Sequence, residues 1–172
     1  MFAADSVVHV FLIRHAVAFE RDARRWPDDR QRPLTAEGRK KFRKGAGGLA
    51  RLVGEVECVV TSPLVRAQQT AEILASVAGW PRAIEAPQLA PGQGVEQALA
   101  LIRAHRAGSI ALVGHEPGLS RLAAVGISGT DARASIALKK GGAACLEFDR
   151  VVRAGGAQLL WLVTPKLLRA LA

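Results

Sequence analysis

The hydrophobic pattern begins with a continuous apolar run over Val7–Ile13, which stops at Arg14 and His15. Large aliphatic residues without an intervening glycine or proline predict a strand covered on both faces, as in a sheet between two layers of helices. Ligands of open α/β sheets bind beyond the carboxyl ends of the strands. Arg14 and His15 are therefore candidates for an anion site that contains a nucleophile or a proton carrier, and an ordinary basic loop is the alternative that this stretch leaves open.

Helical periodicity follows in three segments of the chain. Thr35 is a good N-cap for a helix that reaches about Val53, and an amphipathic pattern predicts another helix over Val95–His105. Between them, Leu64 to about Ala78 predicts a helix that Ser62 caps, with a proline at its first position. Three glycines in the first of these helices are expected to weaken its middle.

The other segments complete the predicted architecture. Short apolar runs predict further strands at Glu57–Thr61, Ala83–Glu85, Ser109–Val113, Ala143–Phe148 and Gln158–Val163, with helices from about Pro117 to Val125 and near Pro165–Leu168. Strands that alternate with helices indicate an α/β fold, a three-layer α/β/α sandwich with a mostly parallel central sheet. Residues 1–172 contain no internal repeat or linker, so we expect a single domain.

The polar stretch Val17–Gln31 has no apolar period and contains several arginines. We interpret it as a long loop, and loops of this length in compact domains often act as lids. The segment Ile127–Gly142 is rich in glycine and basic residues, and its pattern predicts only a connection.

The composition of the chain indicates its cellular compartment and the kind of partner that it binds. No apolar stretch approaches the ~20 residues of a membrane span, and the opening run is short for a signal sequence, so we expect a cytoplasmic protein. Cys58 and Cys145 lie in separate apolar runs, which favours free thiols. The net charge of +9 favours an anionic partner, and phosphate suits the planar fork of arginine. The chain has no tyrosine and no lysine run, so nucleic acid is not expected.

Three of the predicted strands end in cationic side chains. Arg14 and His15 follow the first, Arg66 lies in the helix after the second, and His115 follows the fourth predicted parallel strand. A parallel sheet gathers these ends at one edge. Guanidinium groups neutralise phosphoryl oxygens and a neutral imidazole is a nucleophile, so the pattern favours phosphoryl transfer.

The segments that carry these residues resemble a known family. Leu12–Ala16, Thr61–Thr70 and Leu112–Pro117 resemble the three signatures of the histidine phosphatase superfamily, in its phosphoglycerate mutase-like branch, and Arg32–Gly38 resembles a fourth element. The short chain without a large inserted cap is most similar to SixA-type phosphohistidine phosphatases. The resemblance spans about Val8 to Leu162 and implies a phosphoglycerate mutase-like fold.

The resemblance also implies roles for individual residues. His15 would be the nucleophile that becomes phosphorylated, within a catalytic and phosphate-binding set of Arg14, His15, Arg66 and His115. Arg32 would bind substrate, and Ser62 is expected mainly to cap its helix, although its hydroxyl is a second candidate binder. Ala16 replaces the usual glycine, a change that is tolerable where φ stays negative. No cofactor and no metal ion are expected.

One departure from the family pattern concerns the proton donor. Gln88 stands where many family members that act on phosphate esters have an acidic residue. An alkoxide leaving group needs a proton in the transition state, whereas the nitrogen of phosphohistidine depends less on a positioned acid. The pattern therefore favours a phosphoramidate substrate. Four carboxyl groups stay open as alternative donors: Asp28, Asp29, Glu85 and Glu116.

The sequence thus predicts a metal-independent phosphatase that dephosphorylates phosphohistidine in a protein, with a phosphorylated protein or a small phosphorylated molecule as its partner. A small-molecule phosphomonoesterase of the same superfamily is the alternative. A binding module that holds phosphate or another polyanion without turnover is less favoured, because Arg14, His15, Arg66 and His115 are all present.

Overall fold

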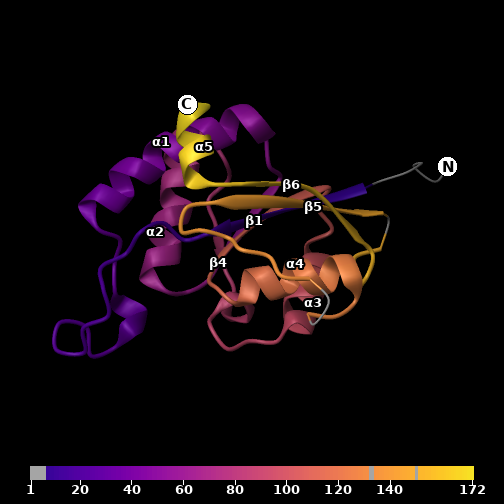
Figure 1. Ribbon diagram of the computed structural model, residues 1–172, viewed down its shortest axis with the longest axis horizontal. Coiled ribbons are helices and arrows are strands. Elements are labelled where there is room, and N and C mark those ends of the chain that lie inside the picture. The colour runs from indigo at the N-terminus through magenta and orange to yellow at the C-terminus, as the bar shows by residue number, and fades with distance from the viewer. Residues whose placement is uncertain (1–6, 132–133, 150) are drawn as a thin grey trace.

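The computed structural model describes residues 7–131, 134–149 and 151–172. Six strands form one sheet in the order β3-β2-β4-β1-β5-β6. Figure 1 shows one side of this sheet, where β1, β5 and β6 lie side by side. The bounds of the six strands are β1 (Val7–Arg14), β2 (Cys58–Thr61), β3 (Ile84–Glu85), β4 (Ser109–Gly114), β5 (Ala143–Asp149) and β6 (Ala157–Val163). The first four run parallel, whereas β5 is antiparallel to β1 and β6 is antiparallel to β5. The α/β fold is confirmed, with a mixed sheet.

Strand β1 lies inside the sheet, with β4 on one side and β5 on the other. Its side chains alternate between two cores: Phe11 and Ile13 belong to one, and Val10 and Leu12 belong to the other. All four side chains are buried. The prediction of a strand covered on both faces is confirmed, because an uninterrupted apolar run leaves neither face suited to water.

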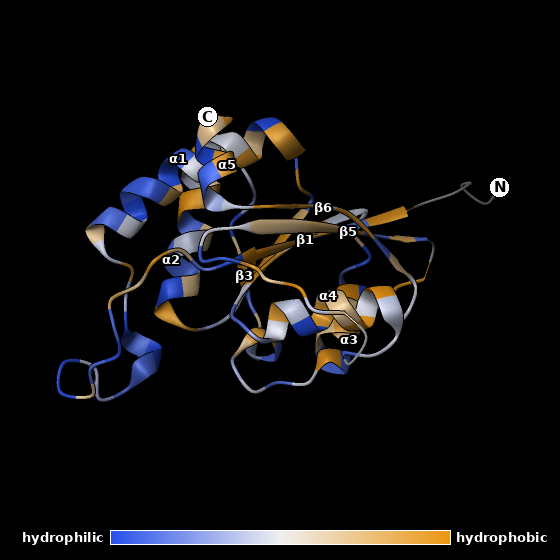
Figure 2. Cartoon of the chain, viewed as in Figure 1, coloured by the Kyte–Doolittle hydropathy of each residue, from blue (hydrophilic) through white to orange (hydrophobic). Residues whose placement is uncertain are grey.

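Helices cover both faces of the sheet. The first core takes buried side chains from α1 (Ala36–Val53), α2 (Val65–Ile73) and α5 (Pro165–Ala170), and the second takes them from α3 (Val95–His105) and α4 (Gly118–Ser128). A π-helical turn, η2 (Leu74–Ala78), extends α2 to the end predicted for that helix. Figure 2 shows the strands mostly in hydrophobic colours and much of α1 in hydrophilic ones. No helix among the described residues is long and apolar enough to span a membrane.

Helix α1 is continuous despite its glycines. Thr35 caps it as predicted, since its side chain accepts a hydrogen bond from the backbone N–H of Gly38 at 2.9 Å. Gly45 and Gly48 are buried, and a Cβ atom at Gly48 would lie 1.8 Å from the carbonyl oxygen of Leu168 in α5. The expected weak point is therefore the place where α5 packs directly on the backbone of α1.

The polar stretch before α1 forms a projecting loop, visible beyond the helices in Figure 1. We call residues 19–31 the arm. A single bridge between Ala18 and Leu34 closes its base, and a 3-10 turn, η1 (Asp29–Gln31), ends it. The Arg25 guanidinium stacks 4.6 Å from the ring centroid of Phe19 and 4.5 Å from that of Trp26. The predicted loop is confirmed, and its role as a lid stays a prediction.

The connection predicted over 127–142 contains residues 132 and 133, which lie outside the described part of the chain. Its first residues belong to α4, which runs on to Ser128, beyond the predicted end near Val125. Helical periodicity continues there through Ile127, and the helix stops at Gly129, whose φ of 81° is left-handed.

Candidate active site

The carboxyl ends of β1, β2 and β4 meet at one edge of the sheet. The backbone N–H of His15 donates to the carbonyl of Gly114 at 3.0 Å, and that of Ser62 donates to the carbonyl of Val113 at 2.9 Å. These bonds fix the three strand ends side by side. The rings of His15 and His115 consequently lie with centroids 5.0 Å apart.

His15 is buried and held in one orientation. Its Nδ1 lies 2.7 Å from the carbonyl oxygen of Ala16, which can only accept, so Nδ1 carries the proton and Nε2 carries the lone pair. Burial lowers the pKa of His15 to about 4, and the charges of Arg66, Arg14 and Lys140 act in the same direction. The imidazole is therefore neutral at physiological pH, with a nucleophilic nitrogen at Nε2.

Ala16 fits its position without strain. Among the described residues the only non-glycine with a positive φ is Arg106, so the backbone at Ala16 suits an L-residue. The N–H of Ala16 donates to Oγ1 of Thr70 at 3.1 Å, and that hydroxyl donates to the carbonyl of Arg66 at 2.7 Å. Helix α2 is thereby tied to the backbone that follows His15.

His115 has one occupied and one unpartnered nitrogen. Its Nε2 lies 2.8 Å from Oγ of Ser62, and its Nδ1 is buried without a hydrogen-bond partner. Burial lowers the pKa of His115 to about 3, with further contributions from the charges of His15, Arg66 and Arg14. A neutral ring that accepts the Ser62 hydroxyl at Nε2 keeps its proton on Nδ1, where it is available to an anion.

The prediction that Ser62 caps α2 is wrong. The N-cap is Leu64, which offers no side-chain hydrogen bond, and α2 begins at Val65. The Ser62 hydroxyl is fully buried, accepts a long hydrogen bond of 3.4 Å from the backbone N–H of Leu64, before the helix, and lies 2.8 Å from Nε2 of His115. The Ser-Pro pair has the local signature of a helix start, but the contact with His115 joins residues 53 positions apart and cannot be inferred from local sequence.

The two arginines of the predicted pocket each keep a donor free. Arg14 donates from Nη1 to the carbonyl of Leu138 at 2.9 Å, and Arg66 donates from Nη1 to the carbonyl of Asp29 at 2.9 Å. Nε of both side chains is buried and has no acceptor among the described residues. Buried donors without acceptors are rare in folded proteins, and a bound anion would satisfy these two together with Nδ1 of His115.

Arg32 lies next to Arg66, but the arm holds most of its guanidinium. Its Nε donates to Oδ1 of Asp29 at 2.7 Å, and its Nη1 donates to the carbonyl of Phe19. Nη2 is the nitrogen that remains for a substrate. The structure thus brings Arg32 to the predicted site through a shared carboxylate.

The structure separates the proton-donor candidates. Gln88 and His115 line the same cavity of about 30 Å³, so the glutamine lies beside the site. A hydrogen bond from Arg32, together with the charges of Arg66, Arg32 and Arg21, holds the pKa of Asp29 below its usual value against the opposing effect of burial. A carboxylate stabilised in its ionised form is a poor acid, which argues against Asp29 as the donor.

The other candidate acids differ in their contacts. Asp28 is exposed and accepts from the backbone N–H of Arg30, and Glu85 accepts from Nε2 of Gln68 at 2.7 Å. Glu116 accepts from the Ser120 hydroxyl through Oε2, and its Oε1 is buried without a partner. None of these contacts directs a carboxyl group to His15.

Sequence reasoning did not assign Asp29 a contact with arginine, and it did not single out Lys140 or Leu138. These residues come from the arm and from the connection before β5, where no hydrophobic periodicity indicates which way a side chain faces. The large number of arginines around Asp29 was the only available signal.

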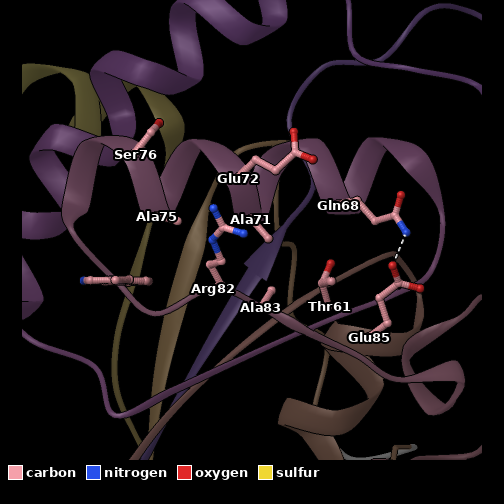
Figure 3. Close-up of a pocket in the computed structure, with 10 residues that line it drawn as sticks. Thr61, Gln68, Ala71, Glu72, Ala75, Ser76, Arg82, Ala83 and Glu85 are labelled. Atoms are coloured by element: carbon pink, nitrogen blue, oxygen red, sulfur yellow. Dashed lines mark hydrogen bonds between the residues drawn. The ribbon is translucent and has the colours of Figure 1, made fainter.

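A second hollow lies away from these residues. A groove of about 730 Å³ runs between α2 and β3, and polar side chains such as Gln68, Glu72, Arg82 and Glu85 line it (Figure 3). Glu85, one of the candidate proton donors, lines this groove, whereas Arg14, His15, Arg66 and His115 do not. Among the described residues, no group of three or more His, Cys, Asp or Glu side chains is arranged to hold a metal ion.

Comparisons with known proteins agree with this geometry. Residues 10–90 match the model of the histidine phosphatase superfamily (branch 1). An uncharacterized protein of Picosynechococcus sp. is 34% identical over 119 residues, which are 67% of this chain and 71% of that protein. The structure of the protein histidine phosphatase SixA complexed with tungstate has a TM-score of 0.81 and 27% identity, over 94% of this chain and 99% of that chain.

A putative α-ribazole-5'-P phosphatase from Escherichia coli has a TM-score of 0.70, covering 92% of this chain and 97% of its own. Its identity to this chain is 21%, so the likeness shows the fold alone.

Proposed function

The chain belongs to the histidine phosphatase superfamily, which implies phosphatase activity, and from this premise we propose the chemistry and the substrate. We propose that residues 1–172 form one histidine phosphatase domain that works without a metal ion through a covalent phosphohistidine on His15. We further propose that its substrate is phosphohistidine in a protein.

The observation that carries the proposal is the state of His15. Its proton is held at Nδ1 by the Ala16 carbonyl, and its low pKa keeps Nε2 unprotonated. In the first step Nε2 attacks phosphorus and the phosphorus–nitrogen bond of the substrate breaks. A substrate ring that carries a proton on its other nitrogen leaves as neutral imidazole and needs no proton from the protein. In the second step water attacks the same phosphorus, the bond to Nε2 breaks, and inorganic phosphate leaves.

Three N–H groups are suited to the phosphoryl oxygens. Nε of Arg14, Nε of Arg66 and Nδ1 of His115 are buried and lack other acceptors. Fixed donors in a site with little water stabilise charge that spreads over the equatorial oxygens in the transition state. Ser62 acts in this scheme through His115, since its hydroxyl holds Nε2 of that ring.

The substrate class rests on Gln88 and on the similarity to SixA. Gln88 shares a cavity with His115 and has no proton to give as an acid. A leaving nitrogen tolerates this environment better than an alkoxide does, which supports a phosphoramidate. The 27% identity to a protein histidine phosphatase whose structure holds tungstate, an oxyanion, supports the same choice.

A small-molecule phosphomonoesterase is the second candidate. It is favoured by the similarity in fold to the putative α-ribazole-5'-P phosphatase. It requires a proton donor, and Glu116 is the candidate whose buried Oε1 has no partner.

The proposal is tested by turnover of a phosphohistidine-containing protein and of phosphoserine, an ester whose leaving alkoxide needs a proton, with wild type and His15→Ala. We expect the wild type to prefer the phosphoramidate, and the variant to lose about 10³-fold or more in kcat/KM on both. His9→Ala is the control, since His9 pairs with Glu147 outside the site. An active His15→Ala protein would contradict the covalent mechanism, and equal or better turnover of the ester would contradict the substrate class.

A further inference from the structure

Asp29 joins the arm to the phosphate-binding arginines. Its Oδ2 lies 3.1 Å from Nη2 of Arg66, and its Oδ1 lies 2.7 Å from Nε of Arg32. In the described part of the chain, no other carboxylate forms an ion pair with either arginine. The side chain of Arg66 is 4% exposed, so its one ionic partner has a strong influence on its position.

The contacts divide the Arg66 guanidinium into two sides. Both terminal nitrogens face one residue, because Nη1 donates to the carbonyl of Asp29 and Nη2 pairs with its carboxylate. Nε lies outside this pair of contacts and is the buried donor without an acceptor. A planar guanidinium that is held at both terminal nitrogens has a fixed plane, and its Nε–H therefore has a fixed direction.

We propose that Asp29 is a positioning residue, which holds Arg66 at its outer end so that Nε–H is directed at the phosphoryl group. The arm is then part of the active site, since it supplies the residue that orients a phosphate-binding arginine. This inference rests on the proposed function, in that Arg66 binds phosphate.

Charge balance supports positioning over competition with the substrate. Burial lowers the pKa of Arg66 most, the charge of nearby Arg32 lowers it further, and Asp29 opposes both effects. Without the carboxylate, two guanidiniums would repel each other at a site with little water. A residue that merely competed with phosphate would instead cover the Nε side of Arg66, which is the side left free.

The arm is built to keep Asp29 in place. Asp28 caps the η1 turn by accepting from Arg30, and Arg32 is tied to the carbonyl of Phe19. The stack of Arg25 on Phe19 and Trp26 stiffens the rest of the arm. The position of Asp29 therefore depends on contacts within the arm, which lies outside the α-helices and strands of the fold.

The test compares Asp29→Asn, Asp29→Glu and a control in the same arm, Glu20→Gln. We expect Asp29→Asn to lower kcat on the phosphohistidine protein by about 10–100-fold with a smaller change in KM, because misdirected donors fail most in the transition state. Asp29→Glu should restore part of the loss. Glu20→Gln removes the same charge from an exposed side chain elsewhere in the arm, and should stay within about twofold of wild type.

Inorganic phosphate gives a readout that needs no turnover. Calorimetric titration should show phosphate binding to Asp29→Asn weakened by about 10-fold, and binding to Glu20→Gln unchanged. Unchanged or tighter phosphate binding by Asp29→Asn would overturn the proposal, and tighter binding would identify Asp29 as a competitor. A wild-type protein that binds phosphate but hydrolyses neither substrate would refute the proposed function. The role of Asp29 would then still be tested by the ratio of the phosphate affinities of wild type and Asp29→Asn.

Discussion

At the residue scale, the neutral state of His15 sets the acid limit of the reaction. The group with a pKa of about 4 is active when unprotonated, so activity is retained above that pH and lost as pH falls through it. We expect kcat/KM to stay nearly constant from about pH 7 to 5 and to fall below about pH 4. The measurement is a pH profile of kcat/KM in buffers of constant ionic strength. A fall centred near the ordinary histidine value of 6.5 would contradict the buried, neutral imidazole.

Lys140 provides a variant that moves this limit. Its positive charge lowers the pKa of His15, so Lys140→Gln should raise that pKa and shift the acid limb of the profile to higher pH. Lys139→Gln removes the same charge from the adjacent exposed residue, which does not contribute to the pKa of His15, and should leave the limb in place. Equal shifts in both variants would mean that net charge alone is responsible.

The catalytic candidates could be predicted from the sequence because each follows a strand that can be recognised by its apolar run. Arg14, His15 and His115 adjoin such runs, and parallel packing then implies that they meet. Asp29 belongs to a segment without a periodic pattern, so its contact with Arg66 could not be predicted. Ser62 was assigned by a local capping rule, and a contact distant in sequence overrode that rule.

At the scale of elements, the packing of α5 on α1 depends on one glycine. A Cβ at Gly48 would lie 1.8 Å from the Leu168 carbonyl oxygen, whereas one at Gly47 would lie 3.8 Å from Cβ of Ala172, an ordinary contact. Gly48→Ala should lower the free energy of unfolding by about 1–3 kcal/mol. Gly47→Ala should change it little or raise it by up to about 1 kcal/mol, since alanine favours a helix. Chemical denaturation of both variants checks the pair, and equal effects would contradict the close approach.

The same helix shows the limit of propensity as a guide. The sequence predicts a weak segment at these glycines, because glycine disfavours a helix in isolation. The burial of Gly45 and Gly48 against a helix more than 100 residues later gives a different reason for their presence. Periodicity placed α1 and α3 well because it reports the face that each helix buries, and it does not report which neighbour that face meets.

At the scale of the whole molecule, the two buried histidines make the fold sensitive to acid. Their pKa values are about 4 and about 3 in the folded chain and near 6.5 when exposed, so below about pH 6.5 the unfolded state binds more protons. The free energy of unfolding should therefore fall with pH by about 1 kcal/mol per unit for each histidine, until the folded pKa values are reached. Denaturation curves at pH 7, 6, 5 and 4 measure the slope. His15→Ala should show a shallower slope, and an unchanged slope would contradict the contribution of His15.

The central place of β1 also has a consequence for synthesis of the protein. The strand is made before its neighbours in the sheet, which begin about 100 or more residues later, at Ser109 and Ala143. Pairings this distant in sequence form slowly, because the intervening chain must first be closed into a loop. A nascent chain released before Ala143 has β1 with one edge unpaired, next to His15. A truncated product of this kind would therefore lack a stable active site and would expose an apolar strand edge, which makes it prone to aggregation and a target for chaperones.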